Sequence, residues 1–90
     1  MTNLRIIYTG NVQGVGFRYT VKQVAAGYEV VGWVRNLDDG SVELQASGEE
    51  AEVEAFLEGI ARGQLARHIK QVQRTELDGA DTPTGFEIRR

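Results

Sequence analysis

A glycine-rich segment near the N-terminus has the composition of an anion site. It runs from Gly10 to Phe17 and is followed directly by Arg18. Glycines let successive backbone N–H groups turn toward one point, and a helix beginning after them adds partial positive charge. A guanidinium can bind two phosphate oxygens at once, unlike a lysine. The same spacing also fits a turn that needs positive φ angles, with Arg18 merely on the surface.

The segment is not a nucleotide-binding P-loop, because no Gly-Lys-Ser/Thr closes it. The rest of the chain offers little other chemistry. There is no cysteine and one histidine, His68, which excludes thiolate sites and makes a histidine metal site or a Ser-His-Asp triad improbable. We expect His68 to cap the second helix or its exit loop, and Asp38-Asp39 to form a turn before Gly40. No metal or cofactor is therefore expected.

Composition predicts one folded domain over residues 1–90, with 41% hydrophobic and 26% charged residues. The net charge of −3 argues against broad nucleic-acid binding. Residues 1–36 nevertheless hold four basic residues and one acidic residue, so an anion site is expected there. Since no signal peptide or run of about 18 apolar residues is visible, we expect a cytoplasmic protein without membrane contact. A small charged domain of this kind is expected to be a monomer.

Hydrophobic patterns predict the elements that would position the glycine-rich segment. Leu4, Ile6 and Tyr8 alternate with Arg5, Ile7 and Thr9, which indicates a strand before the segment. An apolar stripe from Phe17 to Tyr28 predicts a helix after it. Two strands then form a hairpin closed at Asp39-Gly40.

A second helix is predicted from the capping-box spacing of Ser47-Gly48-Glu49-Glu50 and the apolar residues that follow. A further strand falls between Ile69 and Leu77, either with a bulge near Ile69 or with a later start. Residues Asp78 to Thr84 favour turns, and Phe86 to Ile88 alternate as a last short strand.

This order predicts an α+β fold of the ferredoxin-like, split βαβ type (βαββαβ), with two helices on one face of an antiparallel sheet. The first two strands would run parallel with the third between them. Asn36, at the end of the second strand, would then lie at the same end of the sheet as the glycine-rich segment. Trp33 is expected in the core rather than as a stacking surface, although the alternation leaves its face open.

Three motifs carry a resemblance to a known family. They are Gly10-x-Val12-Gln13-Gly14-Val15-x-Phe17-Arg18, Gly32-Trp33-Val34-x-Asn36 and Asp39-Gly40-x-Val42-Glu43. With the second helix and Gly85-Phe86-x-Ile88, they cover nearly the whole chain. In these positions the sequence resembles the acylphosphatase family.

The resemblance implies a metal-independent hydrolase that cleaves small acyl phosphates to a carboxylate and inorganic phosphate. Arg18 would hold the phosphoryl group, and the residue matching the family's asparagine, Asn36, would position the attacking water. The implied phosphate-binding loop residues are Gln13, Gly14, Val15, Gly16 and Phe17. This chemistry suits the chain, because a carboxylate leaving group has a conjugate-acid pKa of about 4 and needs no general acid.

Two other functions stay open from the sequence. A domain of the same fold could bind or sense an anion without turnover, although such a domain needs no water-positioning amide. Nucleic acid could bind the open face of the sheet, although the acidic balance and the lack of paired aromatic residues in the strands weaken this interpretation.

Overall fold

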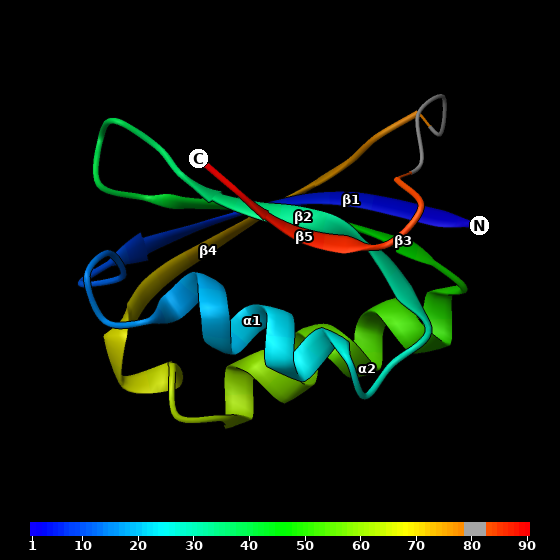
Figure 1. Ribbon diagram of the computed structural model, residues 1–90, viewed down its shortest axis with the longest axis horizontal. Coiled ribbons are helices and arrows are strands. Elements are labelled where there is room, and N and C mark those ends of the chain that lie inside the picture. The colour runs from blue at the N-terminus through cyan, green and yellow to red at the C-terminus, as the bar shows by residue number, and fades with distance from the viewer. Residues whose placement is uncertain (79–82) are drawn as a thin grey trace.

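The computed structural model describes residues 1–78 and 83–90. A five-stranded sheet lies over two helices, with the helices covering one face only (Figure 1). In chain order the elements are β1 (Thr2–Gly10), α1 (Phe17–Ala25), β2 (Val30–Asn36), β3 (Val42–Gly48), α2 (Glu50–Arg62), the short 3-10 helix η1 (Ala66–His68), β4 (Ile69–Glu76) and β5 (Phe86–Arg89). The predicted fold class is thereby confirmed. Most of the predicted turn segment from Asp78 to Thr84 lies outside the described residues.

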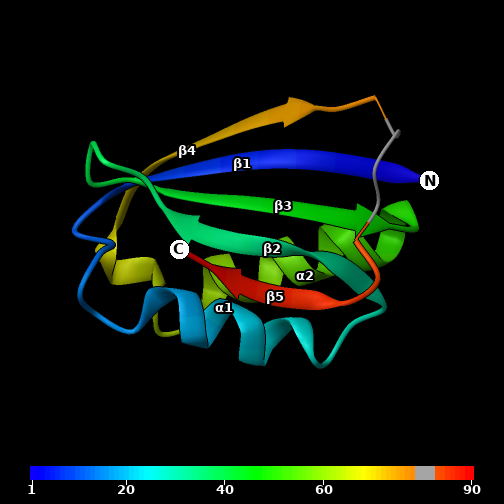
Figure 2. The same ribbon diagram turned by 45° about the horizontal axis from the view of Figure 1, so that its top comes forward.

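The sheet order is β4-β1-β3-β2-β5, which can be followed in Figure 2. Both β1 and β2 pair antiparallel with β3, so these two strands run parallel to each other, as predicted. The last strand pairs parallel with β2, which makes the sheet mixed at that edge rather than antiparallel throughout. The loop after β1 and the end of β2 consequently emerge at the same end of the sheet (Figure 2).

The core lies between the sheet and the two helices. Strand residues at alternate positions face it, and each helix adds one apolar stripe. The buried side chains from these elements include Leu4, Ile6, Tyr8, Val34, Leu44, Phe17, Val21, Val53, Phe56 and Ile60. The strand and helix periodicities predicted from the sequence are therefore confirmed, except that α1 ends at Ala25 and leaves Tyr28, the last residue of the predicted stripe, outside the helix.

Two predictions concern the ends of strands: the bulge near Ile69 is confirmed, and the helix cap at Ser47 is not. The strand after η1 starts at Ile69, and its register against β1 shifts between Thr9 and Gly10, so the bulge alternative is confirmed. The capping box at Ser47 is wrong. Ser47 belongs to β3, its hydroxyl donates to Asn3 Oδ1 at 2.7 Å, and α2 begins after Glu49 without a side-chain cap. The Asn3 side chain already accepts the Ser47 hydroxyl proton, so this hydroxyl is not used to cap the helix.

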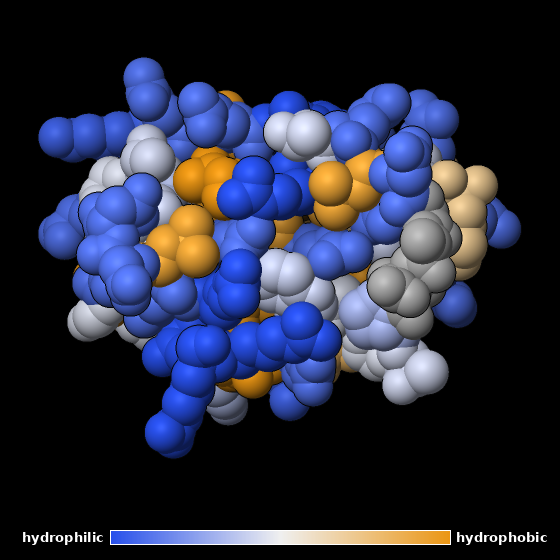
Figure 3. All heavy atoms as spheres, turned by 90° about the horizontal axis from the view of Figure 1, so that it is seen from above, coloured by the Kyte–Doolittle hydropathy of each residue, from blue (hydrophilic) through white to orange (hydrophobic). Residues whose placement is uncertain are grey.

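The expectation that Trp33 lies in the core is also wrong. Its neighbours Gly32 and Val34 face the helices, so the alternation turns Trp33 to the open face. There it is partly exposed, with the guanidinium carbons of Arg35 and Arg89 at 5.0 and 4.9 Å from its ring centroid. Figure 3 shows this face, which is mostly hydrophilic with separated hydrophobic side chains.

Glu43 is the buried charge of the open face. It lies in the central strand, 4% exposed, and accepts hydrogen bonds from Arg5 Nε at 2.5 Å and Arg35 Nε at 2.6 Å. Burial by itself would raise the pKa of Glu43, but the hydrogen bonds and charges of the two arginines outweigh it and hold the pKa below its usual value. The cluster ties β1 to β2 across β3.

We predict that Glu43→Gln lowers the free energy of unfolding by about 1–3 kcal/mol at pH 7, because the two arginines lose a shared partner. A pKa lowered by folding contributes stability that is present above about pH 4.3 and lost as the pH falls through the folded-state pKa. The variant should therefore lose less stability on acidification than the parent in urea unfolding measured from pH 7 to pH 3.

Glu58→Gln is the matched control, since Glu58 pairs with Arg62 on an exposed helix surface. Its loss should stay below about 1 kcal/mol. Equal losses for the two variants, or parallel pH profiles for parent and Glu43→Gln, would contradict the assigned role.

Candidate active site

The loop between β1 and α1 is held in place at its first residues. The backbone N–H of Asn11 donates to the carbonyl of His68 at 2.9 Å, and the Val12 side chain is buried. Gly14 and Gly16 then adopt φ angles of +79° and +74°, in the left-handed region that favours glycine. Gly16 caps α1, and its carbonyl accepts the N–H of Thr20. The glycine spacing thus shapes the turn that leads into the helix.

The Gln13 side chain joins this loop to the β2–β3 hairpin. Its Nε2 donates to the carbonyl oxygens of Leu37 at 2.7 Å and Ser41 at 2.9 Å. The hairpin is itself ordered by Asp39, whose Oδ1 accepts from the N–H of Ser41 at 2.9 Å and from its hydroxyl. The hydroxyl bond is the main cause that holds the pKa of Asp39 below its usual value. Asp39 is a turn residue, as predicted.

Arg18 lies in the first turn of α1 and is partly exposed. Its Nη1 donates to the carbonyl of Arg89 at 3.0 Å, which holds the side chain against β5. Among the described residues no carboxylate forms an ion pair with Arg18, and the first turn of α1 contains no acidic residue. Its remaining guanidinium N–H groups are therefore available to an anion.

A depression of about 200 Å³ opens where the loop, α1, β2 and β5 meet. Its lining residues are Val12, Gly14, Gly16, Phe17, Arg18, Tyr19, Asn36 and Ile88. Arg18 and Asn36 thus come together, with three of the predicted loop residues beside them. The side chain of Asn36 makes no hydrogen bond within the residues that the structure describes, which leaves its amide free to face the depression.

The lining of the depression differs from the predicted set of site residues: two predicted residues are missing from it, and residues outside the predicted set belong to it. Gln13 and Val15 do not line the depression, because Gln13 reaches the hairpin and Val15 packs on the core. Sequence reasoning missed Tyr19, which is 63% exposed, and Ile88. Ile88 comes to the site through the parallel pairing of β5 with β2, where it faces Val34. Only the short alternation from Phe86 to Ile88 hints at that strand.

Fold and site together define a ferredoxin-like α+β protein with a glycine- and arginine-lined depression at one end of its sheet. Residues 4–88 match the family model Acylphosphatase. An acylphosphatase of Oceanobacillus iheyensis is 42% identical over 91 residues, with 99% of each chain covered. The crystal structure of acylphosphatase from Bacillus subtilis has a TM-score of 0.90 at 38% identity and full coverage of both chains.

An acylphosphatase structure from Coxiella burnetii gives a TM-score of 0.85 at 33% identity, covering 98% of this chain and 92% of the other. The chain belongs to the acylphosphatase family, as its motifs predicted.

The Gln13 bonds to the hairpin lead to a stability prediction. Gln13→Ala should lower the free energy of unfolding by about 1–2 kcal/mol, because two carbonyl oxygens lose a donor. Gln13→Glu should cost more at pH 7, about 2–4 kcal/mol, since a carboxylate would face both oxygens. That cost should shrink on acidification, because a protonated carboxyl can donate again. Urea unfolding at pH 7 and pH 5 measures both effects.

Gln73 provides the control, since it is exposed on β4 and makes no side-chain hydrogen bond within the described residues. Its replacement by Ala or Glu should change stability by less than about 0.5 kcal/mol. If the Gln13 and Gln73 variants behave alike, the bridge does not stabilise the loop.

Proposed function

We propose that this acyl phosphate hydrolase holds the phosphoryl group with Arg18 and the backbone N–H groups of residues 13–17, and positions the attacking water with Asn36. One observation carries the proposal. Two side chains with free hydrogen-bonding groups, 18 residues apart in sequence, line the same small depression at the N-terminus of α1. The reaction is inferred from membership of the family, and the residues proposed to carry it out are inferred from this geometry.

Binding the phosphoryl group requires positive charge and N–H donors directed at one point. Arg18 contributes a guanidinium whose orientation is fixed by the carbonyl of Arg89. The left-handed glycines bring the loop backbone around the helix N-terminus, where partial positive charge accumulates. These groups would stabilise the charge on the equatorial oxygens as the transition state forms.

Asn36 is suited to hold a water because its amide has both an acceptor oxygen and donor N–H groups. The water oxygen attacks phosphorus, and the bond between phosphorus and the carboxyl oxygen breaks. The electron pair leaves with the carboxylate, and the water protons pass to the phosphate product and to solvent. Since the leaving carboxylate has a conjugate-acid pKa of about 4, no general acid is needed. Positioning and charge stabilisation then account for the catalysis.

The same chemistry limits the substrates. A phosphomonoester would expel an alkoxide, a far poorer leaving group than a carboxylate, and the roles proposed for Arg18 and Asn36 include no general acid to protonate it. Small acyl phosphates are therefore the proposed substrate class, with the acyl group unspecified by the lining residues.

The similar proteins give no support to the alternative of a non-catalytic anion-binding domain. The single domain over residues 1–90, the monomeric state and the cytoplasmic location stay predictions. Among the helices of the described residues, none has the length and apolar character to span a membrane.

We predict that the purified protein hydrolyses a simple acyl phosphate in the presence of EDTA. Arg18→Ala should lower kcat/KM by about 10²–10³-fold, and Arg18→Lys should recover little, because a lysine cannot bind two oxygens in a fixed plane. Asn36→Ala should lower kcat by more than it raises KM, since its contact is to water rather than to substrate. Steady-state kinetics of folded variants measures all three.

Arg62→Ala and Gln73→Ala are matched controls, because both residues lie on exposed surfaces away from the depression and should leave the kinetics unchanged. Full kcat in Asn36→Ala would remove Asn36 from the mechanism. Loss of all activity in EDTA, restored by a divalent ion, would overturn the metal-independent proposal.

A second prediction concerns inorganic phosphate. A ligand that binds only the folded state at ten times its Kd adds about 1.4 kcal/mol of stability. For a domain of this size that corresponds to a rise in Tm of about 6–11 °C. We expect the rise with phosphate but not with chloride at equal ionic strength, and no rise in Arg18→Ala. A Tm that responds equally in parent and variant would show that phosphate does not bind at this site.

A further inference from the structure

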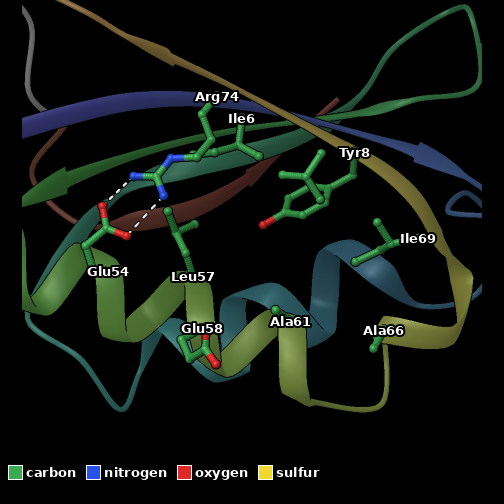
Figure 4. A pocket seen from close by; sticks show the side chains of 10 residues that line it. Ile6, Tyr8, Glu54, Leu57, Glu58, Ala61, Ala66, Ile69 and Arg74 are labelled. Atoms are coloured by element: carbon green, nitrogen blue, oxygen red, sulfur yellow. Dashed lines mark hydrogen bonds and ion pairs between the residues drawn. The ribbon is translucent and has the colours of Figure 1, made fainter.

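A second hollow, which we call the β4 groove, lies between the sheet and α2 (Figure 4). It has a volume of about 300 Å³. The lining residues are Ile6, Tyr8, Glu54, Leu57, Glu58, Ala61, Ala66, Ile69, Val72 and Arg74. None of them lines the candidate active site. The volume is at the lower end of the range of small-molecule sites in proteins.

The walls of the β4 groove are mainly aliphatic. Ile6 comes from β1, Leu57 from α2 and Ile69 from the start of β4, and all three side chains border the same space (Figure 4). Val72 adds apolar surface that is 52% exposed, although it pairs with the core residue Tyr8. Because β4 is an edge strand, its helix-facing residues lack the full cover that the central strands receive. The groove therefore exposes apolar surface that a ligand would bury.

One polar atom stands among these apolar side chains. Tyr8 is only 3% exposed, yet its hydroxyl points into the groove and makes no hydrogen bond within the described residues (Figure 4). Burial raises the pKa of Tyr8, so this hydroxyl stays protonated and neutral at physiological pH. No buried polar side-chain atom of the described residues is left without a partner, so this hydroxyl reaches solvent through the groove, and a ligand's polar atom would take the place of that solvent.

The charged residues at the rim are already paired. Arg74 donates to the Glu54 carboxylate through Nη1, at 3.1 Å, and through Nη2, and Glu58 pairs with Arg62 at 2.6 Å. The contact with Arg74 also lowers the pKa of Glu54. A charged ligand would therefore find no free counter-ion at the groove and would lose its hydration on entry. The rim favours an uncharged occupant.

We propose that the β4 groove is a second ligand site, which takes an uncharged, single-ring molecule with one hydrogen-bonding group that pairs with the Tyr8 hydroxyl. Apolar walls accept the ring, and the hydroxyl orients it by donating to a carbonyl or ether oxygen or accepting from an O–H. Phenols, benzyl alcohols and small aromatic ketones belong to this class.

The proposed ligand would also contact two residues, Tyr8 and Ala66, that are connected to the loop between β1 and α1. The inferred effect on phosphate binding rests on the proposed function. The Tyr8 ring lies 5.2 Å from that of Phe17, which lines the depression beside Arg18. Ala66 begins η1, whose last residue, His68, accepts the N–H of Asn11 in the loop. Binding in the β4 groove therefore changes phosphate affinity, and phosphate changes the ligand's affinity by the same factor.

The test is a titration of the ¹⁵N-labelled protein with p-cresol and with toluene, which differ only by a hydroxyl, followed by NMR. We expect p-cresol to bind with a millimolar Kd, and toluene several-fold more weakly. The largest shifts should fall on Tyr8, Leu57, Ile69 and Val72. Tyr8→Phe should weaken p-cresol to the level of toluene while leaving toluene unchanged, because only the hydroxyl pair is lost.

Two variants test the location. Ala61 is exposed on α2 and borders the groove, so Ala61→Phe should fill it and abolish binding of both probes. Ala51→Phe is the matched control, because Ala51 is exposed on the same helix and does not line the groove. Equal binding of p-cresol in both variants would contradict the proposed site. So would the absence of binding to the parent at a p-cresol concentration about 20-fold above the expected millimolar Kd.

The coupling is measured separately, as the Kd of inorganic phosphate with and without saturating p-cresol. We expect a change of at least about twofold, absent in Ala61→Phe. If p-cresol binds and the phosphate Kd does not move, the site stands and its coupling to the loop is wrong. If phosphate fails to bind even without p-cresol, the proposed function fails and the ligand site is unaffected.

Discussion

The site depends on the alignment of β1 and β2, which run parallel because both pair antiparallel with β3. This alignment brings the glycine loop after β1 and Asn36 at the end of β2 to one end of the sheet. The Gln13 side chain then holds the glycine loop close to the β2–β3 hairpin by donating to two carbonyl oxygens of that hairpin. Arg18 is placed by a different element, the carbonyl of Arg89 in β5. Four strands, β1, β2, β3 and β5, thus set the geometry of one small depression.

Most of the fold was predictable because the apolar side chains of β1 face the helices at alternate positions. Leu4, Ile6 and Tyr8 face the helices while their neighbours do not, and this alternation is visible in the sequence. That Arg18 and Asn36 lie at the same end of the sheet was predictable too, since it follows from strand order. The motif resemblance added their expected roles, which geometry by itself does not assign.

The failures have a common physical cause, which is competition between local patterns and long-range pairing. Ser47 has the spacing of a helix cap, yet the hydroxyl is used by Asn3 of a strand more than 40 residues away. Trp33 is large and apolar, yet strand phase directs it outward, where two arginines cover its ring. Ile88 reaches the site only because β5 pairs with β2 in parallel. None of these partners is specified by nearby residues.

The two hollows share no lining residue, but the ring of Tyr8, which lines the β4 groove, packs against the ring of Phe17, which lines the depression. Tyr8 contributes its ring to the core beside Phe17 and its hydroxyl to the β4 groove, so a single side chain faces both regions. The edge position of β4 leaves the groove open beside that hydroxyl, whereas the helix-facing positions of the central strand β3 are Val42, Leu44, Ala46 and Gly48, which carry no polar side-chain atom. Because the Tyr8 hydroxyl has no protein partner among the described residues, it is the polar group that the proposed ligand would bind in the groove.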